Sequence, residues 1–174
     1  MNKQKDRYQR GENFQDEIRR SWRRLSNLWR LRIEDSSGSR PGDEIVLTMD
    51  PEKRPINILG EHKRTNDNKF NLSDMRQGQI QGLLDFESVL PWNFGLVFVS
   101  FYNWDENRDI TFTFRLIKAI KYMRDNDRAS VPLEDFRTEL PAIEIPLIEK
   151  PITDKPVERL YDMKGVIKYC YQLL

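Results

Sequence analysis

The stretch that decides the fold reads Leu96-Val97-Phe98-Val99-Ser100-Phe101-Tyr102 and then, after a polar tip at 103–109, Ile110-Thr111-Phe112-Thr113-Phe114-Arg115-Leu116. The first arm is almost continuously apolar and rich in β-branched and aromatic residues, which is typical of a strand covered on both faces. In the second arm apolar residues alternate with Thr and Arg, the period of a strand with one buried face. The tip is dense in turn formers. The sequence therefore predicts an antiparallel hairpin over about 96–122.

The length of 174 residues predicts one domain around this hairpin. Charged residues make up 33% of the chain and its mean hydropathy is −0.74. Such a polar chain is expected to have one modest core with solvated arms. We expect an α+β fold, in which a β-rich body carries an N-terminal amphipathic helix and an extended arm punctuated by prolines.

Several further segments have weaker patterns on either side of the hairpin. Short strands are predicted at 45–49 and 56–59, followed by a polar loop at 61–71. A short helix is expected from Ser130 to Leu140. Three segments leave helix and strand open, with a strand favoured at 166–173 within the last of them: 73–90, 116–123 and 157–174.

The best-patterned helix is predicted from Phe14 to Ile33. One arc of this helix is apolar, and we expect it to provide an apolar anchor formed by Phe14, Ile18, Trp22, Leu25 and Trp29. The opposite side is basic, and we expect it to bind an anionic surface through Arg19, Arg20, Arg23, Arg24 and Arg30. The alternative is that the apolar arc packs on the protein's own core while the arginines are solvated or paired with the acidic body.

Charge is distributed unevenly along the chain, although the net charge is only +1. Residues 1–33 hold ten Lys/Arg against four Asp/Glu, whereas the remainder holds nineteen against twenty-four. This asymmetry points to an anionic partner such as nucleic acid or a membrane surface. The expected organisation is a basic arm at 1–35, a Ser/Gly-rich linker at 36–42 and a body at 43–174.

Prolines recur every five residues near the end of the body, at Pro141, Pro146, Pro151 and Pro156. This spacing excludes a helix and a central strand, so an extended arm is predicted at 141–156. Two interpretations stay open: a connecting segment packed on its own domain, or a strap through which these prolines mediate self-association.

The sequence offers few residues for the common enzyme mechanisms. Cys170 is the one cysteine and His62 the one histidine, so a His/Cys metal site would lack ligands and a nucleophilic dyad would depend on His62. The flanks of His62 are polar and basic, so we expect an exposed histidine without a role. We therefore predict no enzymatic activity, no metal and no cofactor.

The N-terminus has no apolar segment of the kind found in signal peptides, and the longest apolar run is far shorter than the ~20 residues that cross a bilayer. A cytoplasmic or nuclear location is therefore expected, without secretion or a transmembrane segment.

Two functions are favoured by this layout, and an enzyme that uses carboxylates and a bound divalent metal stays open as a third. The first is a non-enzymatic, homo-oligomeric assembly protein, similar in layout alone to viral matrix and coat subunits, whose Trp-bearing helix binds nucleic acid or an anionic membrane. The alternative is an intracellular adaptor or regulator whose N-terminal helix docks in a groove of a protein partner.

Overall fold

A computed structural model describes residues 3–34, 40–103, 105–149 and 159–174. These residues form an α+β fold, as predicted from the sequence. Its elements are α1 (Lys3–Trp22), β1 (Leu28–Arg32), β2 (Glu44–Met49), β3 (Pro55–Thr65), β4 (Lys69–Asn71), η1 (Leu72–Asp74), α2 (Gln77–Val89), β5 (Asn93–Asn103), β6 (Arg108–Arg115), α3 (Leu116–Asp125), β7 (Ser130–Pro132), α4 (Asp135–Thr138), β8 (Ala142–Glu144), β9 (Leu147–Glu149), β10 (Leu160–Tyr161) and α5 (Met163–Tyr171).

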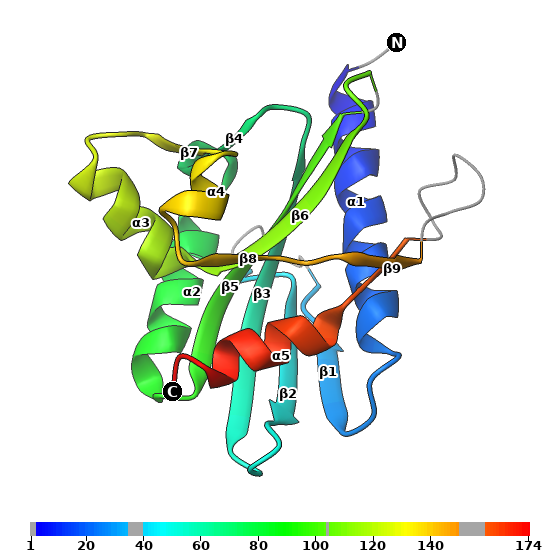
Figure 1. The fold of residues 1–174 in the computed structure, drawn as a ribbon, viewed down its shortest axis with the longest axis vertical. Coiled ribbons are helices and arrows are strands. Elements are labelled where there is room, and N and C mark those ends of the chain that lie inside the picture. The colour runs from blue at the N-terminus through cyan, green and yellow to red at the C-terminus, as the bar shows by residue number, and fades with distance from the viewer. Residues whose placement is uncertain (1–2, 35–39, 104, 150–158) are drawn as a thin grey trace.

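The centre of the molecule is a six-stranded sheet with the order β1-β2-β3-β5-β6-β8 (Figure 1). Strands β3 and β5 are parallel, and all other neighbours in this sheet are antiparallel. The connection between the two parallel strands runs through β4, η1 and α2. A crossover of this kind places a helix on one face of the sheet.

The predicted hairpin is confirmed as β5 and β6, which pair from Leu96 opposite Arg115 to Asn103 opposite Arg108. Its second arm ends at Arg115, because the segment from Leu116 onward is helix α3. The expectation of one solvated face on that arm is wrong. Thr111 and Thr113 are buried, and Thr113 Oγ1 donates a hydrogen bond to the carbonyl oxygen of Val97 (3.1 Å).

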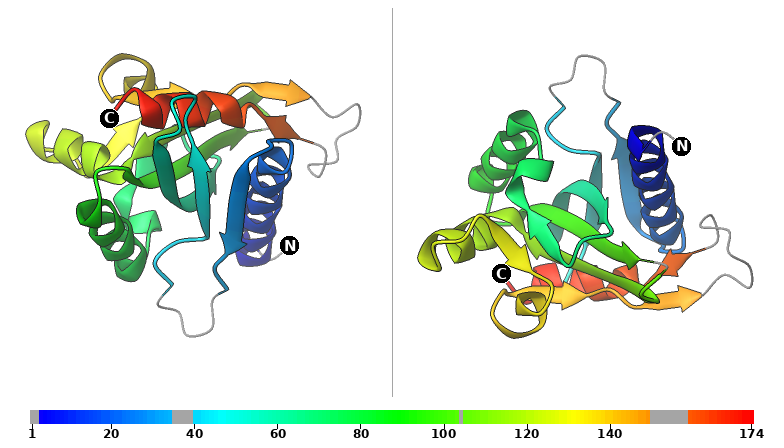
Figure 2. Two further views of the ribbon diagram at one scale, coloured as in Figure 1. Left: turned by 90° about the horizontal axis from the view of Figure 1, so that it is seen from below. Right: turned by 90° about the horizontal axis from the view of Figure 1, so that it is seen from above.

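Helices cover both faces of the sheet (Figure 2). Helices α1 and α5 pack on one face, where the buried cluster includes Phe14, Ile18, Trp22, Val46, Ile58, Phe98, Met163, Val166 and Cys170. Helices α2, α3 and α4 cover the other face, with a cluster that includes Leu59, Leu83, Val97, Val99, Phe112, Phe114, Ala119, Met123 and Phe136. The core is therefore split by the sheet into two apolar layers.

The predicted N-terminal helix is wrong beyond Trp22. The chain turns there, with Asn27 in the left-handed region (φ 63°), a conformation that Asn tolerates better than most residues. Residues Leu28–Arg32 then form β1, which pairs with β2 along its whole length. The helical periodicity after Trp22 was misleading because the backbone gains a ladder of hydrogen bonds by joining the sheet.

The strands predicted at 45–49 and 56–59 are confirmed as β2 and β3. However, β3 continues to Thr65 and so includes half of the predicted polar loop. Its parallel pairing with β5 extends to Thr65 opposite Phe101. The polar residues after Gly60 form a strand because β5 supplies a long apolar neighbour, which their own composition does not reveal.

The segments left open by the sequence are mostly helical. Residues 73–90 contain α2, and the C-terminal segment contains α5 rather than the favoured strand. Asp162 caps α5, its Oδ1 accepting a hydrogen bond from the backbone N–H of Lys164 (3.1 Å). The helix expected from Ser130 to Leu140 is replaced by the short β7 and the single turn α4.

The first half of the proline segment runs along the sheet. Pro141 and Pro146 are exposed and flank β8, which pairs with β6. Beyond them β9 pairs with β10. Pro151 and Pro156 lie outside the described residues, as do residues 36–39 of the predicted linker.

Within the described part of the chain, the search for a helix both long enough and apolar enough to cross a bilayer finds none.

Candidate active site

A cleft with a volume of about 820 Å³ opens between α1, the end of β3 and the start of α2. Its lining comes from elements far apart in the sequence: Gly11, Glu12 and Gln15 of α1, Arg32, Glu34 and Arg40 at the β1–β2 connection, Glu61 to Asn66, Phe70, Ser73, Asp74, Arg76, Gln79 and Val99. The C-terminal half of β3 is therefore the floor of the cleft.

The alternation of β3 sorts its polar residues onto two faces. Glu61 and Lys63 point toward α2, where Lys63 Nζ lies 2.8 Å from Glu61 Oε1. His62 and Arg64 point toward α1, where both contact Phe14: the ring of His62 lies edge-on to it, and the Arg64 guanidinium lies 4.8 Å from its centroid. A carboxylate and an ammonium group thus share the side of the strand that faces α2.

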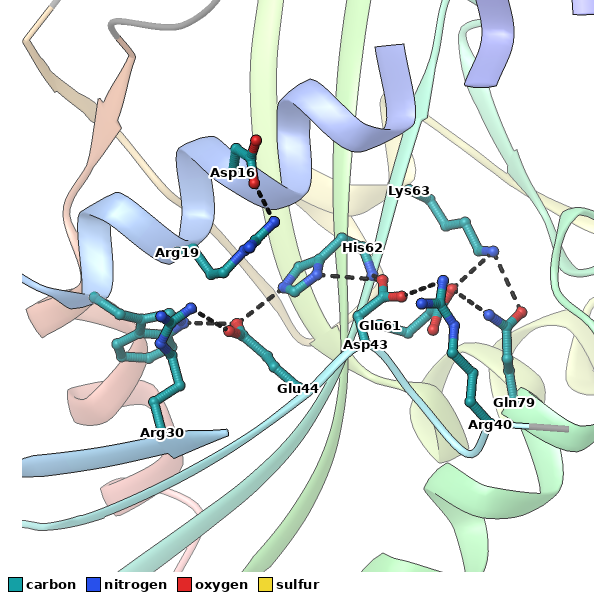
Figure 3. A network of polar contacts seen from close by, with 11 residues as sticks. Asp16, Arg19, Arg30, Arg40, Asp43, Glu44, Glu61, His62, Lys63 and Gln79 are labelled. Carbon is teal, nitrogen blue, oxygen red and sulfur yellow. Dashed lines mark hydrogen bonds and ion pairs between the residues drawn. The ribbon is translucent and has the colours of Figure 1, made fainter. Parts of the chain in front are cut away.

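Asp43 brings a second carboxylate to this place. It directly precedes β2, and its backbone N–H donates a hydrogen bond to the carbonyl oxygen of Gly60 in β3 (2.7 Å). Its Oδ2 accepts a hydrogen bond from the backbone N–H of His62 (2.7 Å), and its Oδ1 forms an ion pair with Arg40 (2.6 Å). Figure 3 shows this ion pair between Arg40 and Asp43.

Glu61 is 1% exposed, yet only one of its oxygens is bound. Oε1 accepts from Lys63 and from the amide Nε2 of Gln79 (2.6 Å). Oε2 is buried and has no hydrogen-bond partner. Because most buried polar atoms are paired, an unpaired carboxylate oxygen beside a cleft is a feature that requires an explanation.

His62 connects this group to a second one. Its Nδ1 lies 3.2 Å from Asp43 Oδ2 and its Nε2 lies 3.0 Å from Glu44 Oε1, so the imidazole bridges two carboxylates (Figure 3). Glu44 also accepts from Trp22 Nε1 (2.9 Å) and pairs with Arg30 (3.3 Å). The prediction of an exposed histidine is wrong, because β3 carries His62 into the core.

The pKa values follow from these contacts. Burial opposes the charged form of His62, but the charge of Glu44 and the hydrogen bonds of Asp43 and Glu44 raise its pKa to about 9. Burial also opposes ionisation of Asp43, but the hydrogen bonds and charges of His62 and Arg40 lower its pKa. For Glu61, burial and the nearby charge of Asp43 raise the pKa above its ordinary value. The two carboxyl groups are thus driven apart in acidity.

Basic side chains gather around the rest of the cleft. The lining includes Arg32, Arg40, Lys63, Arg64 and Arg76. Acidic residues are also present, at Glu12, Glu34 and Asp74. The cleft therefore combines cations suited to an anionic ligand with carboxylates at its floor.

The apolar residues predicted as an anchor have a different place. Phe14, Ile18 and Trp22 are fully buried in the layer between α1 and the sheet, so in this structure they do not offer a surface to a partner. Leu25 packs partly against the same cluster. Trp29 is 54% exposed on the edge strand β1.

The predicted anion-binding arginines are not brought together. Arg19 forms an ion pair with Asp16 on α1, and Arg30 pairs with Glu44 beneath α1 (Figure 3). Arg23 and Arg24 are exposed after the helix end, and Arg20 is half-buried. Among the described residues that line the cleft, none of these five appears.

Sequence reasoning missed Asp43, Glu61, Lys63 and Gln79. A signal existed in the spacing Glu61-His62-Lys63, since residues two apart on a strand share one face. Because residues 61–71 were predicted to form a loop, Glu61 and Lys63 were not expected to share a face of a strand.

Within the described residues, no group of three or more His, Cys, Asp and Glu side chains is arranged to hold a metal ion. A cation at this cleft would therefore depend on two carboxylates together with water or ligand oxygens, a mode typical of Mg²⁺. Neither the family models nor the curated proteins searched contain a match to this chain.

Proposed function

We propose that this protein is a divalent-cation-dependent hydrolase that cleaves phosphodiester bonds of nucleic acid in the cleft at the end of β3. The observation that carries the proposal is the buried Oε2 of Glu61, which lacks a partner at the floor of a cleft lined by arginines. The prediction of a protein without enzymatic activity did not consider these residues, because their segment was taken for a loop.

Asp43 and Glu61 are the residues that would hold the cation. Glu61 lies in β3, and Asp43 directly precedes β2 and is held to β3 by the hydrogen bond from its backbone N–H to the carbonyl oxygen of Gly60 (2.7 Å). The unpaired oxygen of Glu61 fits a hard cation, which prefers carboxylate oxygens. When bound, such a cation polarises a phosphoryl oxygen and lowers the pKa of a coordinated water.

Lys63 has a role that follows from its position. Its ammonium group lies 2.8 Å from Glu61 Oε1, beside the proposed cation site, where it can neutralise charge that develops on the phosphoryl oxygens. The overall step is hydrolysis: the oxygen of one water bonds to phosphorus, the bond to the leaving ester oxygen breaks, and that oxygen takes up a proton. The products are a phosphate monoester and an alcohol.

Nucleic acid is favoured over a small phosphate ester by the extent of the basic lining. Arg32, Arg40 and Arg76 come from three separate segments around a cleft of about 820 Å³. Several guanidinium groups around one cleft suit a ligand with repeated phosphates, with which they can form charge-assisted hydrogen bonds.

The test is cleavage of labelled DNA and RNA, offered as single strands, duplexes and branched structures, with Mg²⁺ or Mn²⁺ and with EDTA. We expect cleavage that needs the cation and that falls at least about 100-fold in Glu61→Gln and in Lys63→Met, since removing a group that stabilises the transition state has effects of this size. The matched control is Glu144→Gln on β8. It removes an exposed ion pair between Glu144 and Arg137 of α4. Cleavage by Glu61→Gln at the wild-type rate would overturn the proposal.

A second candidate is binding of the same polymer without cleavage, as in the assembly protein expected from the sequence. The arginine lining supports it as well. Salt-sensitive binding of every substrate in the panel, without cation-dependent cleavage of any, is the result that favours it. Self-association, membrane binding and docking in a protein groove stay predictions.

A further inference from the structure

Gln79 touches both functional groups that the proposed function assigns to β3. It is 3% exposed and lies in the first turn of α2. Its Nε2 donates to Glu61 Oε1 (2.6 Å), and its Oε1 accepts from Lys63 Nζ (3.3 Å) (Figure 3). Its Oε1 also accepts from the backbone N–H of Arg76 (2.9 Å). One amide thus binds a carboxylate, an ammonium group and the beginning of its own helix.

The chemistry of the amide suits this position. Gln carries a donor and an acceptor on one planar group, so it can serve an anion and a cation together without adding charge. It binds Oε1 of Glu61, while Oε2 of the same carboxylate is unpaired. By accepting from Lys63 it gives that side chain a second partner, which persists when the charge of Glu61 is shared with a cation.

Helix α2 is itself held against the other half of the site. One turn after Gln79, Gly82 packs on Pro41, so closely that a Cβ added at Gly82 would lie 2.6 Å from the Cα of Pro41. Pro41 belongs to the same short segment as Arg40 and Asp43. Consecutive turns of α2 therefore contact the connection that carries Asp43 and the strand that carries Glu61 and Lys63.

We infer that Gln79 is a positioning residue, which orients Glu61 for the cation and holds Lys63 beside it. This inference rests on the proposed function. It assigns to α2 the task of fixing the relative placement of the two groups from β3.

The experiment compares Gln79→Met with Gln81→Met. Gln81 lies two residues further along α2, is exposed and binds Asp85 (2.6 Å), so its replacement tests loss of a glutamine from this helix without contact to the site. We expect Gln79→Met to weaken Mn²⁺ binding and to lower kcat by about 10- to 100-fold, as for other residues that support metal ligands. KM for the oligonucleotide should change much less than kcat, because the substitution removes no arginine side chain from the cleft.

Gln79→Glu provides a second readout, which serves even if the methionine variant fails to fold. When the introduced carboxyl group is ionised, it still accepts from Lys63 but cannot donate to Glu61, whereas the protonated carboxyl group can do both. The activity of this variant relative to the wild type should therefore rise as pH falls. Because an ionised carboxyl group beside Glu61 would also destabilise the fold, activity is expressed per folded protein, measured by circular dichroism at each pH. A residue that only stabilises the fold would then leave this ratio constant.

The outcomes separate the two proposals. A wild type that binds Mn²⁺ and cleaves, together with a Gln79→Met variant of unchanged kcat and Mn²⁺ affinity, overturns the role of Gln79 alone. A wild type that neither binds Mn²⁺ nor cleaves overturns both.

Discussion

Glu17 and Glu61 are both buried glutamates, but only Glu17 has hydrogen-bond partners for both of its carboxylate oxygens. Burial raises the pKa of each, in spite of nearby cations that lower it. Glu17 uses both oxygens, accepting from the two terminal nitrogens of Arg64 and from the hydroxyl of Tyr161 (3.2 Å). Glu61 leaves one oxygen unpaired. The difference teaches that burial of a charge alone does not mark a functional residue, whereas burial with unused binding capacity beside a cleft does.

The two residues also lie on opposite faces of the sheet. Glu17 belongs to the layer between α1 and β3, where Arg64 and Arg159 form a network that extends to Asp109 (2.9 Å from Arg159 Nε). Asp109 Oδ1 is also buried and unpaired, but Asp109 does not line the cleft. Glu61 faces α2 and the cleft. We therefore assign the first network to stability and the second to chemistry.

The largest expected effect is a difference in the free energy of unfolding between a variant of the Glu17 network and a variant of Glu61. Glu17→Gln should lower the free energy of unfolding by about 3 kcal/mol, because it leaves the buried guanidinium of Arg64 without its counter-ion. Glu61→Gln should change the same quantity by less than about 1 kcal/mol, since its lost partner, Lys63, is partly exposed. Urea denaturation followed by fluorescence measures both. Equal losses in the two variants would contradict the division.

A smaller effect is expected from Gly82→Ala, which sharpens the comparison on the side of Glu61. The added methyl group would overlap the backbone of Pro41, 2.6 Å from its Cα, and overpacking of this kind costs about 1–3 kcal/mol. The shift of the Asp43 segment should also weaken cation binding. Gly11→Ala is the control for stability, because nothing lies within 4 Å of its added Cβ.

Gly11→Ala should change stability in the opposite direction. Alanine favours a helix interior over glycine, so this control should stabilise α1 by about 0.5–1 kcal/mol. Thermal unfolding of the two alanine variants and the wild type measures the difference. A loss of stability as large as that of Gly82→Ala would show that the Pro41 contact is not the cause.

A similarly small effect is expected in the network of Glu17. Tyr161→Phe removes the hydroxyl that donates to Glu17 (3.2 Å) and should lower the free energy of unfolding by about 1 kcal/mol, the usual net value of one hydrogen bond. Cleavage and cation affinity should remain at wild-type levels, as measured on the folded protein. A tenfold loss of either would place the Glu17 network in the active site.

The elements that could be predicted from the sequence are those whose own apolar periodicity matches their secondary structure. The hairpin of β5 and β6 and the strands around Val46 and Ile58 are examples, because their apolar periodicity matches the structure. The helix was extended past Trp22 because Leu25, Leu28 and Trp29 continue its apolar arc. Leu28 and Trp29 form part of β1 because they pair with the neighbouring strand β2, which their own periodicity does not reveal.

The candidate site escaped prediction for the same reason. Glu61, His62 and Lys63 look like a solvated loop in the sequence, and they are stabilised by residues remote from them: Gln79, Asp43 and Glu44. A polar run is compatible with a buried strand only when such partners exist. The placement of Asp43 and Glu61 therefore depends on contacts with remote residues, which local composition does not determine.

The central claim is tested most directly by titrating Mn²⁺ into the wild type, Glu61→Gln and Tyr161→Phe and measuring binding by calorimetry. The account predicts a saturable site in the wild type and in Tyr161→Phe, and an affinity at least about 10-fold lower in Glu61→Gln. Equal affinity in all three proteins, or no binding to the wild type, would contradict it.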